Sequence, residues 1–374
     1  MSRLFTFLCL SLLFNLAQAQ LPTPEYKKGQ AILSGTIANY NPDDNLIFKI
    51  GAPNIVMGTA ETLYPTVESD GSFTINIPLY HHTQVRMMIG NADLVILLSP
   101  EKETNVAINL SNPPGKQFVF SGQYATINNE WCQPELITKI PPVYSDGDLL
   151  DSIVGISANE FKKRCINQYK RYVTHNSAQL QFSEDTRTLA NLSCAFDCLE
   201  NLQATHYCLQ TAYQKKENIT REQAFAAFLD VYLPDDFHNY LKDFPVNHPL
   251  ALYCYNYRNV VMDLYDTHKD PLAYEKNLLK NAPLTKEEQT LIHQYETAFK
   301  AGISFQQESE LMALSAKYFK ENDQFRWESF SKAKERLSNI IQDSTSLIVD
   351  YIRAIYMRSS FYNLQPLTPR QELM

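Results

Sequence analysis

The cysteines are the residues of this sequence with the most versatile chemistry. Seven Cys are encoded, and one of them, Cys9, lies near the start of the chain. The other six lie after residue 120: Cys132, Cys165, Cys194, Cys198, Cys208 and Cys254. Disulfide oxidoreductases place a Cys-x-x-Cys pair at a helix N-terminus, where the macrodipole lowers the thiol pKa. No Cys-x-x-Cys occurs here, so the sequence predicts disulfides or buried thiols and no catalytic cysteine.

The spacing of Cys194 and Cys198 indicates burial. Residues four apart lie on the same face of a helix, and these two lie beside Leu199 and Leu202. Such a stripe is typical of a helix packed in a core, or of thiols that bridge to neighbouring helices. Six cysteines allow many pairings, so the spacing defines no disulfide connectivity.

A metal site is a second hypothesis for the same segment. Cys194, Cys198, His206 and Cys208 are four candidate ligands close together in the sequence. On one continuous helix, however, His206 and Cys208 point about 200° apart, so the four side chains converge only if the helix breaks. We therefore predict no metal and no cofactor. An enzyme site that uses His206 or Cys208 stays an alternative.

Tyrosines are the other candidate binding residues. The chain contains 22 Tyr, and Tyr253, Tyr255 and Tyr257 surround Cys254. An exposed row of aromatic rings would suit a glycan or a peptide, whereas tyrosines in helices also pack with their hydroxyls at the surface. The sequence leaves both interpretations open.

Composition and motifs exclude several other classes of protein. The formal net charge is -8, which does not supply the basic field that nucleic-acid binding requires. The sequence contains no Gly-x-Gly-x-x-Gly, no Gly-x-x-x-x-Gly-Lys, no Gly-x-Ser-x-Gly and no His-Glu-x-x-His. Nucleotide-loop, serine-hydrolase and zinc-protease chemistry are therefore not expected.

The first residues have the pattern of an export signal. Arg3 precedes a mostly apolar stretch over 4–16, and Ala17-Gln18-Ala19 fits the small-x-small cleavage rule. We expect a signal peptide over 1–19, cleavage after Ala19 and a periplasmic location. No later segment has the run of apolar residues that a membrane span needs, so no membrane span is expected after cleavage.

The mature chain divides near residue 120. Up to that point, short β-type runs alternate with turn residues; Phe73, Ile75 and Ile77 share one face, and the turn Asp70-Gly71 precedes them. The spacing then becomes helical. Helix starts are indicated at Ser157, Thr220, Thr285 and Thr368, with Gly302 as a stop, and further helices are expected over about 186–214, 249–265, 304–321 and 328–362. The predicted fold class is α+β, with an antiparallel β-sandwich-like domain over 20–120 and an α-helical domain over 121–374.

Several short motifs in this order resemble a known leader region. They are Leu33-Ser34-Gly35-Thr36-Ile37-Ala38-Asn39-Tyr40, Asp70-Gly71-Ser72-Phe73, Ile77-Pro78-Leu79, Leu98-Ser99-Pro100-Glu101 and Phe120-Ser121-Gly122-Gln123-Tyr124-Ala125-Thr126-Ile127-Asn128-Asn129-Glu130. The chain resembles the N-terminal part of secreted TlpA/ResA-like thiol-disulfide oxidoreductases of Gram-negative bacteria. That resemblance implies a signal peptide, a β-rich domain and a helical stretch, followed by a thioredoxin-like domain with a Trp-Cys-x-x-Cys active site.

The chain departs from that pattern at the active site. Trp131-Cys132 is followed by Gln133-Pro134-Glu135 without a second cysteine. We therefore predict a periplasmic, non-catalytic accessory or binding protein that acts through the β-domain surface or the groove between the domains. Its expected partner is an envelope protein, a peptide or a glycan, and not nucleic acid. The alternatives are part of an oxidoreductase whose redox domain is missing or separately encoded, and a glycan- or peptide-binding envelope protein.

Overall fold

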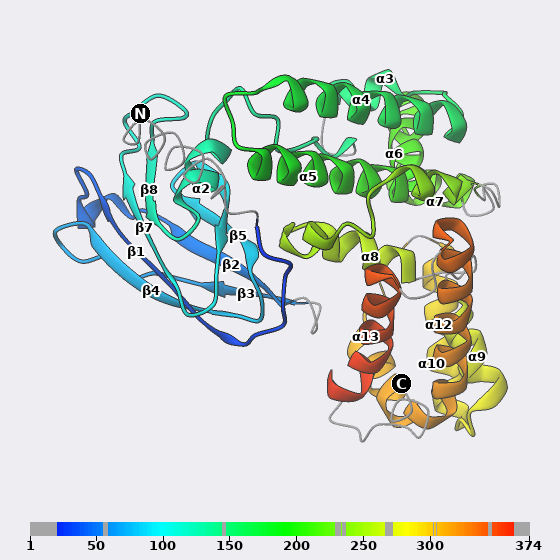
Figure 1. Ribbon diagram of the computed structural model, residues 1–374. Coiled ribbons are helices and arrows are strands. Elements are labelled where there is room, and N and C mark those ends of the chain that lie inside the picture. Colours follow the sequence, from blue (N-terminus) through cyan, green and yellow to red (C-terminus); the bar gives the residue numbers. More distant parts are fainter. Residues whose placement is uncertain are drawn as a thin grey trace, which may run out of the picture.

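The structure is a computed structural model of the chain. It describes residues 21–54, 59–143, 147–228, 233, 237–265, 272–301, 303, 305–342 and 346–362. The expected signal peptide, the stop at Gly302 and the helix start at Thr368 lie outside the described residues. In the described part, strands fill the N-terminal third and helices the remainder (Figure 1), which confirms the α+β class.

Two four-stranded sheets form a β-sandwich. One sheet has the order β4-β1-β7-β8 and the other β3-β2-β5-β6. The strands are β1 (Gly29–Ile37), β2 (Phe48–Asn54), β3 (Thr59–Leu63), β4 (Ser72–Leu79), β5 (Thr83–Ile89), β6 (Ala92–Leu98), β7 (Glu103–Ile108) and β8 (Phe118–Gly122). Neighbouring strands are antiparallel except β1 and β7, which run parallel. The first sheet is thus mixed, because the chain crosses to the second sheet before β7 returns beside β1.

Alternating side chains fill the space between the sheets. Phe73 and Ile77 of β4 are buried, whereas Thr74 and Asn76 between them are exposed. The rings of Phe73 and Phe48 meet edge to face across the sandwich, with centroids 4.9 Å apart. The predicted alternation is therefore present, and it buries one face of each sheet.

Close backbone approaches explain two glycines of the quoted motifs. A Cβ on Gly35 would lie 2.1 Å from the carbonyl oxygen of Val106 on the neighbouring strand. Gly71 follows Asp70 with a φ of +84°, a conformation that L side chains rarely adopt. Both positions therefore need glycine for the strands and the turn to form.

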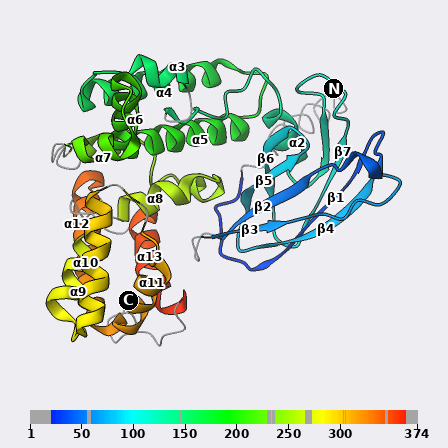
Figure 2. The same cartoon turned by 180° about the vertical axis from the view of Figure 1, so that it is seen from behind.

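Helices form the rest of the described chain. The α-helices are α2 (Ala125–Trp131), α3 (Gly147–Ser152), α4 (Ala158–Ala178), α5 (Glu184–Gln203), α6 (Thr205–Glu217), α7 (Arg221–Phe228), α8 (Tyr257–Tyr265), α9 (Ala273–Asn281), α10 (Lys286–Lys300), α11 (Glu308–Lys317), α12 (Phe319–Ile341) and α13 (Leu347–Tyr362). Short 3-10 helices are η1 (Pro42–Asp44), η3 (Phe237–Asp243) and η4 (Pro249–Tyr253). Helices α4 and α5 form an antiparallel pair that extends from the sandwich, and α9 to α13 form a second group beyond α8 (Figures 1 and 2).

Three predicted helix starts have the expected caps. The Ser157 side chain accepts a hydrogen bond from the N–H of Glu160, and Thr285 and Glu288 form a complete capping box. Thr220 and Gln223 form the same reciprocal pair of hydrogen bonds. Each motif satisfies backbone N–H groups that a helix leaves without an intrahelical partner.

The expected helix over 186–214 is two helices. α5 ends at Gln203 and α6 begins at Thr205, with Ala204 as the junction. The Thr205 hydroxyl donates to the carbonyl oxygen of Leu202, which gives this side chain a local partner at the bend. Apolar periodicity continued across the junction, because both helices bury a face in one core, and so it did not reveal the break.

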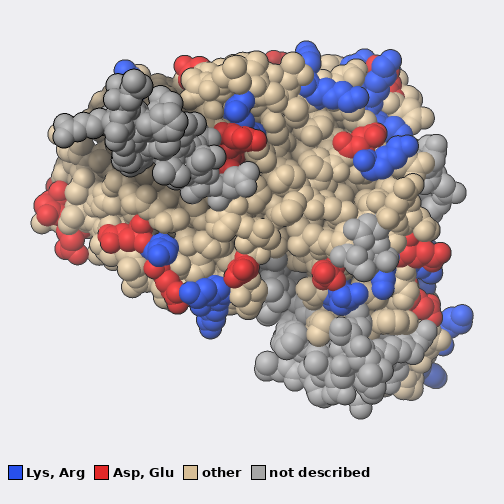
Figure 3. Space-filling model, viewed as in Figure 1, with Lys and Arg blue, Asp and Glu red and all other residues tan. Residues whose placement is uncertain are grey.

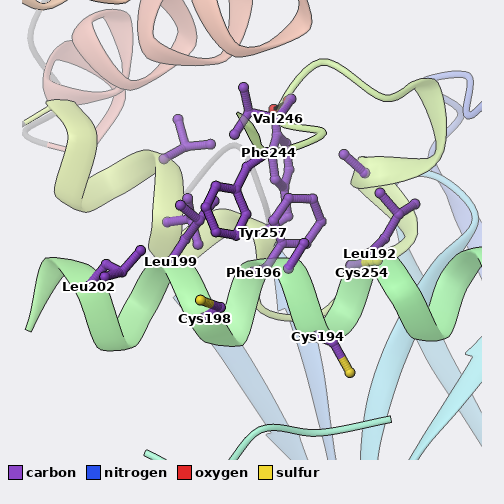
Figure 4. Close-up of a cluster of buried hydrophobic side chains, with 14 of the residues drawn as sticks. Leu192, Cys194, Phe196, Cys198, Leu199, Leu202, Phe244, Val246, Cys254 and Tyr257 are labelled. Carbon is purple, nitrogen blue, oxygen red and sulfur yellow. Dashed lines mark hydrogen bonds between the residues drawn. The ribbon is translucent and has the colours of Figure 1, made fainter. Parts of the chain in front are cut away.

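Helix α5 is the centre of the helical core. Twelve of its residues are buried, on more than one face, because α4, α8 and α2 all pack against it. Figure 4 shows Phe196 and Tyr257 facing each other on one side of α5, while Cys194 points to another side. The ring centroids of Phe196 and Tyr257 are 4.9 Å apart. No helix within the described residues is long and apolar enough to cross a membrane.

Candidate functional site

A cleft lies between the sandwich and the helical domain. Its volume is about 470 Å³, which is within the range of small-molecule sites. One wall comes from β5 and β6, and the other from α5 and the start of α8. The end of α2, the loop before β8 and residues 138–142 close the remaining sides. The cleft therefore exists only where the two domains meet.

Three consecutive residues of α2 hold the walls of this cleft in place. Asn128 exchanges two hydrogen bonds with the backbone of β6, and Asn129 exchanges two with the backbone of Phe120 on β8. The Glu130 carboxylate accepts from the N–H and hydroxyl of Ser183 and from the hydroxyl of Thr186, at the start of α5. A carboxylate at a helix N-terminus is stabilised by the macrodipole. One helix turn thus fixes both sheets relative to α5.

Three further hydrogen bonds cross the boundary between the sandwich domain and the helices. The buried Gln84 side chain of β5 accepts a hydrogen bond from the N–H of Tyr255. The Tyr253 hydroxyl donates to the carbonyl oxygen of Pro22 in the segment that leads into β1. Leu21 is buried in the helical core, and its N–H donates to Asp185 of α5. The described N-terminal segment therefore lies along the boundary between the sandwich and the helical domain.

The α5 wall carries two partly buried carboxylates, Asp197 and Glu200. Asp197 accepts hydrogen bonds from the N–H of Ile140 and from the side-chain amide of Asn256, and Glu200 accepts from the amide of Asn259. Burial is the main reason that the pKa of Asp197 rises to about 6 and that of Glu200 to about 7. Within the described residues, neither carboxylate belongs to an ion pair. Both are therefore partly protonated near neutral pH.

Asn256 has an unusual position on the same wall. It is 9% exposed, and its amide nitrogen donates to Ser193 and Asp197. Its Oδ1 atom is buried and has no hydrogen-bond partner within the described residues. A buried acceptor without a donor is energetically unfavourable, and this atom is enclosed by the protein and not exposed to the cleft.

The opposite wall carries a neutralised ion pair. Arg86 donates from Nε and Nη2 to the two carboxylate oxygens of Asp93, at 2.8 and 2.6 Å. This pairing raises the pKa of Arg86 and lowers the pKa of Asp93. Lys139 is exposed at the rim and lies near enough to Asp93, Asp197 and Glu200 to lower their pKa values slightly. The two walls thus differ. On the sandwich wall the charges of Arg86 and Asp93 cancel, whereas the α5 wall carries two carboxylates, which accept hydrogen bonds.

The position of the two raised carboxylates limits the chemistry that they can perform. Asp197 and Glu200 lie three residues apart on α5, and therefore on one face of one helix. Glycosidases instead place their two carboxyl groups on either side of the scissile bond. Carboxylates on a single wall are better suited to holding a ligand than to acid–base attack from two sides.

The structure separates the three candidate tyrosines. Tyr253 and Tyr257 are buried, and the Tyr257 hydroxyl donates to the carbonyl oxygen of Val246 inside the core. Only Tyr255 lines the cleft. The three rings therefore do not form an exposed row. The reason is that the segment changes from the 3-10 helix η4 to α8 between Tyr253 and Tyr257, so that successive odd positions do not share a face.

The six cysteines are free thiols. Cys165, Cys194, Cys198, Cys208 and Cys254 are buried, and Cys132 is half-buried at the edge of the cleft. Burial raises the pKa of Cys132, Cys165 and Cys194 to about 12, and it raises the pKa of Cys198 and Cys254 further. The reactive species in thiol exchange is the thiolate. These thiols therefore have the properties of core residues.

The His206 segment does not gather ligands. The break at Ala204 is the event that the metal hypothesis required, yet no group of three His, Cys, Asp or Glu side chains within the described residues could hold a metal ion. His206 instead shares a hydrogen bond with the carbonyl oxygen of Phe228, and Cys208 is buried.

The sequence arguments missed most residues of the cleft. Its polar residues come from three segments that are far apart in the chain: Arg86 and Asp93, Asp197 and Glu200, and Asn256. The available signal was in α5, where Asp197 and Glu200 interrupt a stretch that is otherwise buried on several faces. Carboxylates at such positions are rarely buried without a partner. Comparisons with protein-family models, curated proteins and solved structures give no match for this chain.

Proposed function

We propose that this protein is a periplasmic binding or accessory protein whose ligand site is the cleft between its two domains. The observation that carries the proposal is the cleft itself: its volume of about 470 Å³ suits a small ligand or a few residues of a peptide, and aromatic, amide and charged side chains converge on it. The location and the accessory role rest on the leader and on the resemblance to the N-terminal part of TlpA/ResA-like proteins.

The state of the thiols supports a non-catalytic role. A thiol whose pKa is about 12, such as that of Cys132, is almost entirely protonated at neutral pH. Thiol–disulfide exchange needs a thiolate and access to the partner disulfide. The described thiols are protonated and largely buried, so the protein would assist redox chemistry only through binding.

The two tryptophans of the chain allow a direct test of the cleft. Trp131 lines the cleft, whereas Trp327 packs against the rings of Phe330 and Tyr356 in the helical domain. The variant Trp327→Phe leaves Trp131 as the sole indole, so its fluorescence reports on the cleft. The reverse variant, Trp131→Phe, is the matched control.

Four probes of different chemistry cover the main ligand classes. They are maltotriose, citrate, n-butylamine and the blocked tripeptide acetyl-Ala-Lys-Ala-amide, each at millimolar concentration. We expect at least one of them to change Trp131 emission in a saturable manner and to leave the Trp131→Phe control unchanged. If all four leave Trp131 unchanged while the protein remains folded, the cleft is not the ligand site.

A further inference from the structure

We infer that the ligand of the cleft carries a primary ammonium group, which binds between Asp197 and Glu200 on the α5 wall. This inference rests on the proposed function of the cleft and specifies the ligand chemistry. It follows from a mismatch between the two walls. On the sandwich side, Arg86 and Asp93 neutralise each other. On the helical side, the described donors to the two carboxylates are all neutral N–H groups.

A cation is the group that no described residue supplies to these two carboxylates as an ion-pair partner. The partial burial of Asp197 and Glu200 disfavours their charged forms. Lys139 lowers the pKa of both carboxyl groups, but its side chain is exposed at the rim of the cleft. A positive charge placed between carboxylates stabilises their ionised forms and forms charge-assisted hydrogen bonds, which are stronger than neutral ones. The ligand would thus supply the missing countercharge.

The donors of an ammonium group fit the two carboxylates of this wall. An ammonium group has three N–H donors and no acceptor. The carboxylates of Asp197 and Glu200 line the same wall of the cleft and are acceptors when ionised. An anion would add a further negative charge to this wall, and a neutral sugar hydroxyl would bring no countercharge.

A metal ion fits the wall less well than an ammonium group. Hard divalent cations such as Ca²⁺ require six or more oxygen ligands, several of them charged. No group of three His, Cys, Asp or Glu side chains within the described residues could hold a metal ion. Two carboxylates are too few for such a cation, but they can accept charge-assisted hydrogen bonds from an amine.

Two probes distinguish a free amine from a lysine side chain. n-Butylamine contains the end of a lysine side chain without a backbone, and acetyl-Ala-Lys-Ala-amide contains it within a peptide whose termini are blocked. The same peptide with an acetylated lysine is the neutral control, because acetylation removes the charge. Trp131 fluorescence in the Trp327→Phe background measures each affinity.

We expect the lysine peptide, the free amine, or both to bind, and the acetylated peptide to bind far more weakly. Asp197→Asn and Glu200→Gln should each weaken binding of the amine probes by about tenfold or more, since each removes a charge-assisted hydrogen bond. Glu184→Gln makes the same change of charge at an exposed position of the same helix and should leave binding unchanged.

Binding of the cation should also release protons. Near pH 6.5 the two carboxylates together hold about one proton, and a cation between them lowers both pKa values, so up to about one proton leaves for each amine bound. Calorimetry in two buffers of different ionisation enthalpy measures this number. Raising the pH to about 8.5, where both groups are already ionised, should abolish the release.

The outcomes separate the two proposals. Equal binding of the lysine peptide and its acetylated form, or a response to maltotriose or citrate alone, would overturn the ammonium inference and leave the cleft as the binding site. A lack of response to all four probes would overturn both. Amine binding that survives the Asp197→Asn and Glu200→Gln changes would place the ammonium group elsewhere in the cleft and would also contradict the inference.

Discussion

Asn128 of α2 and Leu97 of β6 form two hydrogen bonds across the domain boundary, one in each direction. The N–H of Leu97 donates to Asn128 Oδ1 at 2.7 Å, and Asn128 Nδ2 donates to the carbonyl oxygen of Leu97 at 3.1 Å. The Asn128 side chain is buried, so this amide takes the place of a neighbouring strand at the edge of the sheet. The sheet edge that carries Asp93 is held beside α5 in this way.

Removal of the Asn128 side chain should destabilise the fold. Asn128→Ala leaves a buried N–H and a buried carbonyl oxygen of Leu97 without partners, and we expect the free energy of unfolding to fall by about 2–4 kcal/mol. Asn105→Ala removes an amide on the exposed face of β7 and should change it by less than about 0.5 kcal/mol. Urea unfolding of both variants measures the difference. Equal effects would show that the Asn128 contact does not hold the domains together.

The tyrosines around Cys254 should behave differently from one another. Tyr257→Phe leaves the buried carbonyl oxygen of Val246 without its donor, and we expect a loss of about 1–3 kcal/mol in unfolding free energy. Tyr255→Phe changes a side chain at the cleft and should change stability by less than about 0.5 kcal/mol. Thermal unfolding of the two variants is the measurement, and a destabilised Tyr255→Phe with an unaffected Tyr257→Phe would contradict the placement of these rings.

The cleft carboxylates should make stability depend on pH. The folded-state pKa values of Asp197 and Glu200, about 6 and about 7, lie above their ordinary values. The stability that these two groups contribute to the folded state is therefore fully present below about pH 4, and it is lost as the pH rises through their folded-state pKa values. Between about pH 4 and pH 8 these two groups should lower the free energy of unfolding by about 2–5 kcal/mol.

The double variant Asp197→Asn/Glu200→Gln isolates this effect from that of other titrating groups. Lys139 lowers the pKa of Glu200 and Asp263 raises it, and both residues remain in the double variant. The pH profile of the wild type minus that of the double variant should fall with rising pH. A flat difference, or one that rises with pH, would show that the pKa values of these carboxylates are not raised.

The thiols should be unreactive in the folded protein. Cys132 is the most accessible of the six, yet its pKa of about 12 leaves only about one thiolate in 10⁵ molecules at pH 7. We expect iodoacetamide to label the folded protein, produced as residues 20–374, at least tenfold more slowly than the same chain unfolded in urea, which should take up six labels. Mass spectrometry measures both. The folded protein should also not accelerate insulin reduction by dithiothreitol, and acceleration above the reductant alone would contradict the non-catalytic role that we propose.

Local features were predictable from the sequence because their physical causes lie within a few residues. The Ser157 and Thr285 caps satisfy helix amides three residues away. The Asp70-Gly71 turn follows from the conformational freedom of glycine, and the alternation in β4 follows from the geometry of a strand. The α+β class is the sum of such local signals, so it too was accessible from the sequence.

The cleft was decided only by the tertiary structure. Arg86, Asp197 and Asn256 share no local pattern, and they meet because α2 fixes the sandwich against α5 and because α8 packs on α5. The raised pKa values of Asp197 and Glu200 arise from burial, which depends on what packs over a helix face and not on its sequence spacing. Likewise, the change from η4 to α8 buried two of the three tyrosines. Composition and periodicity determine which segments have apolar faces, whereas long-range packing determines which polar groups are enclosed between those faces.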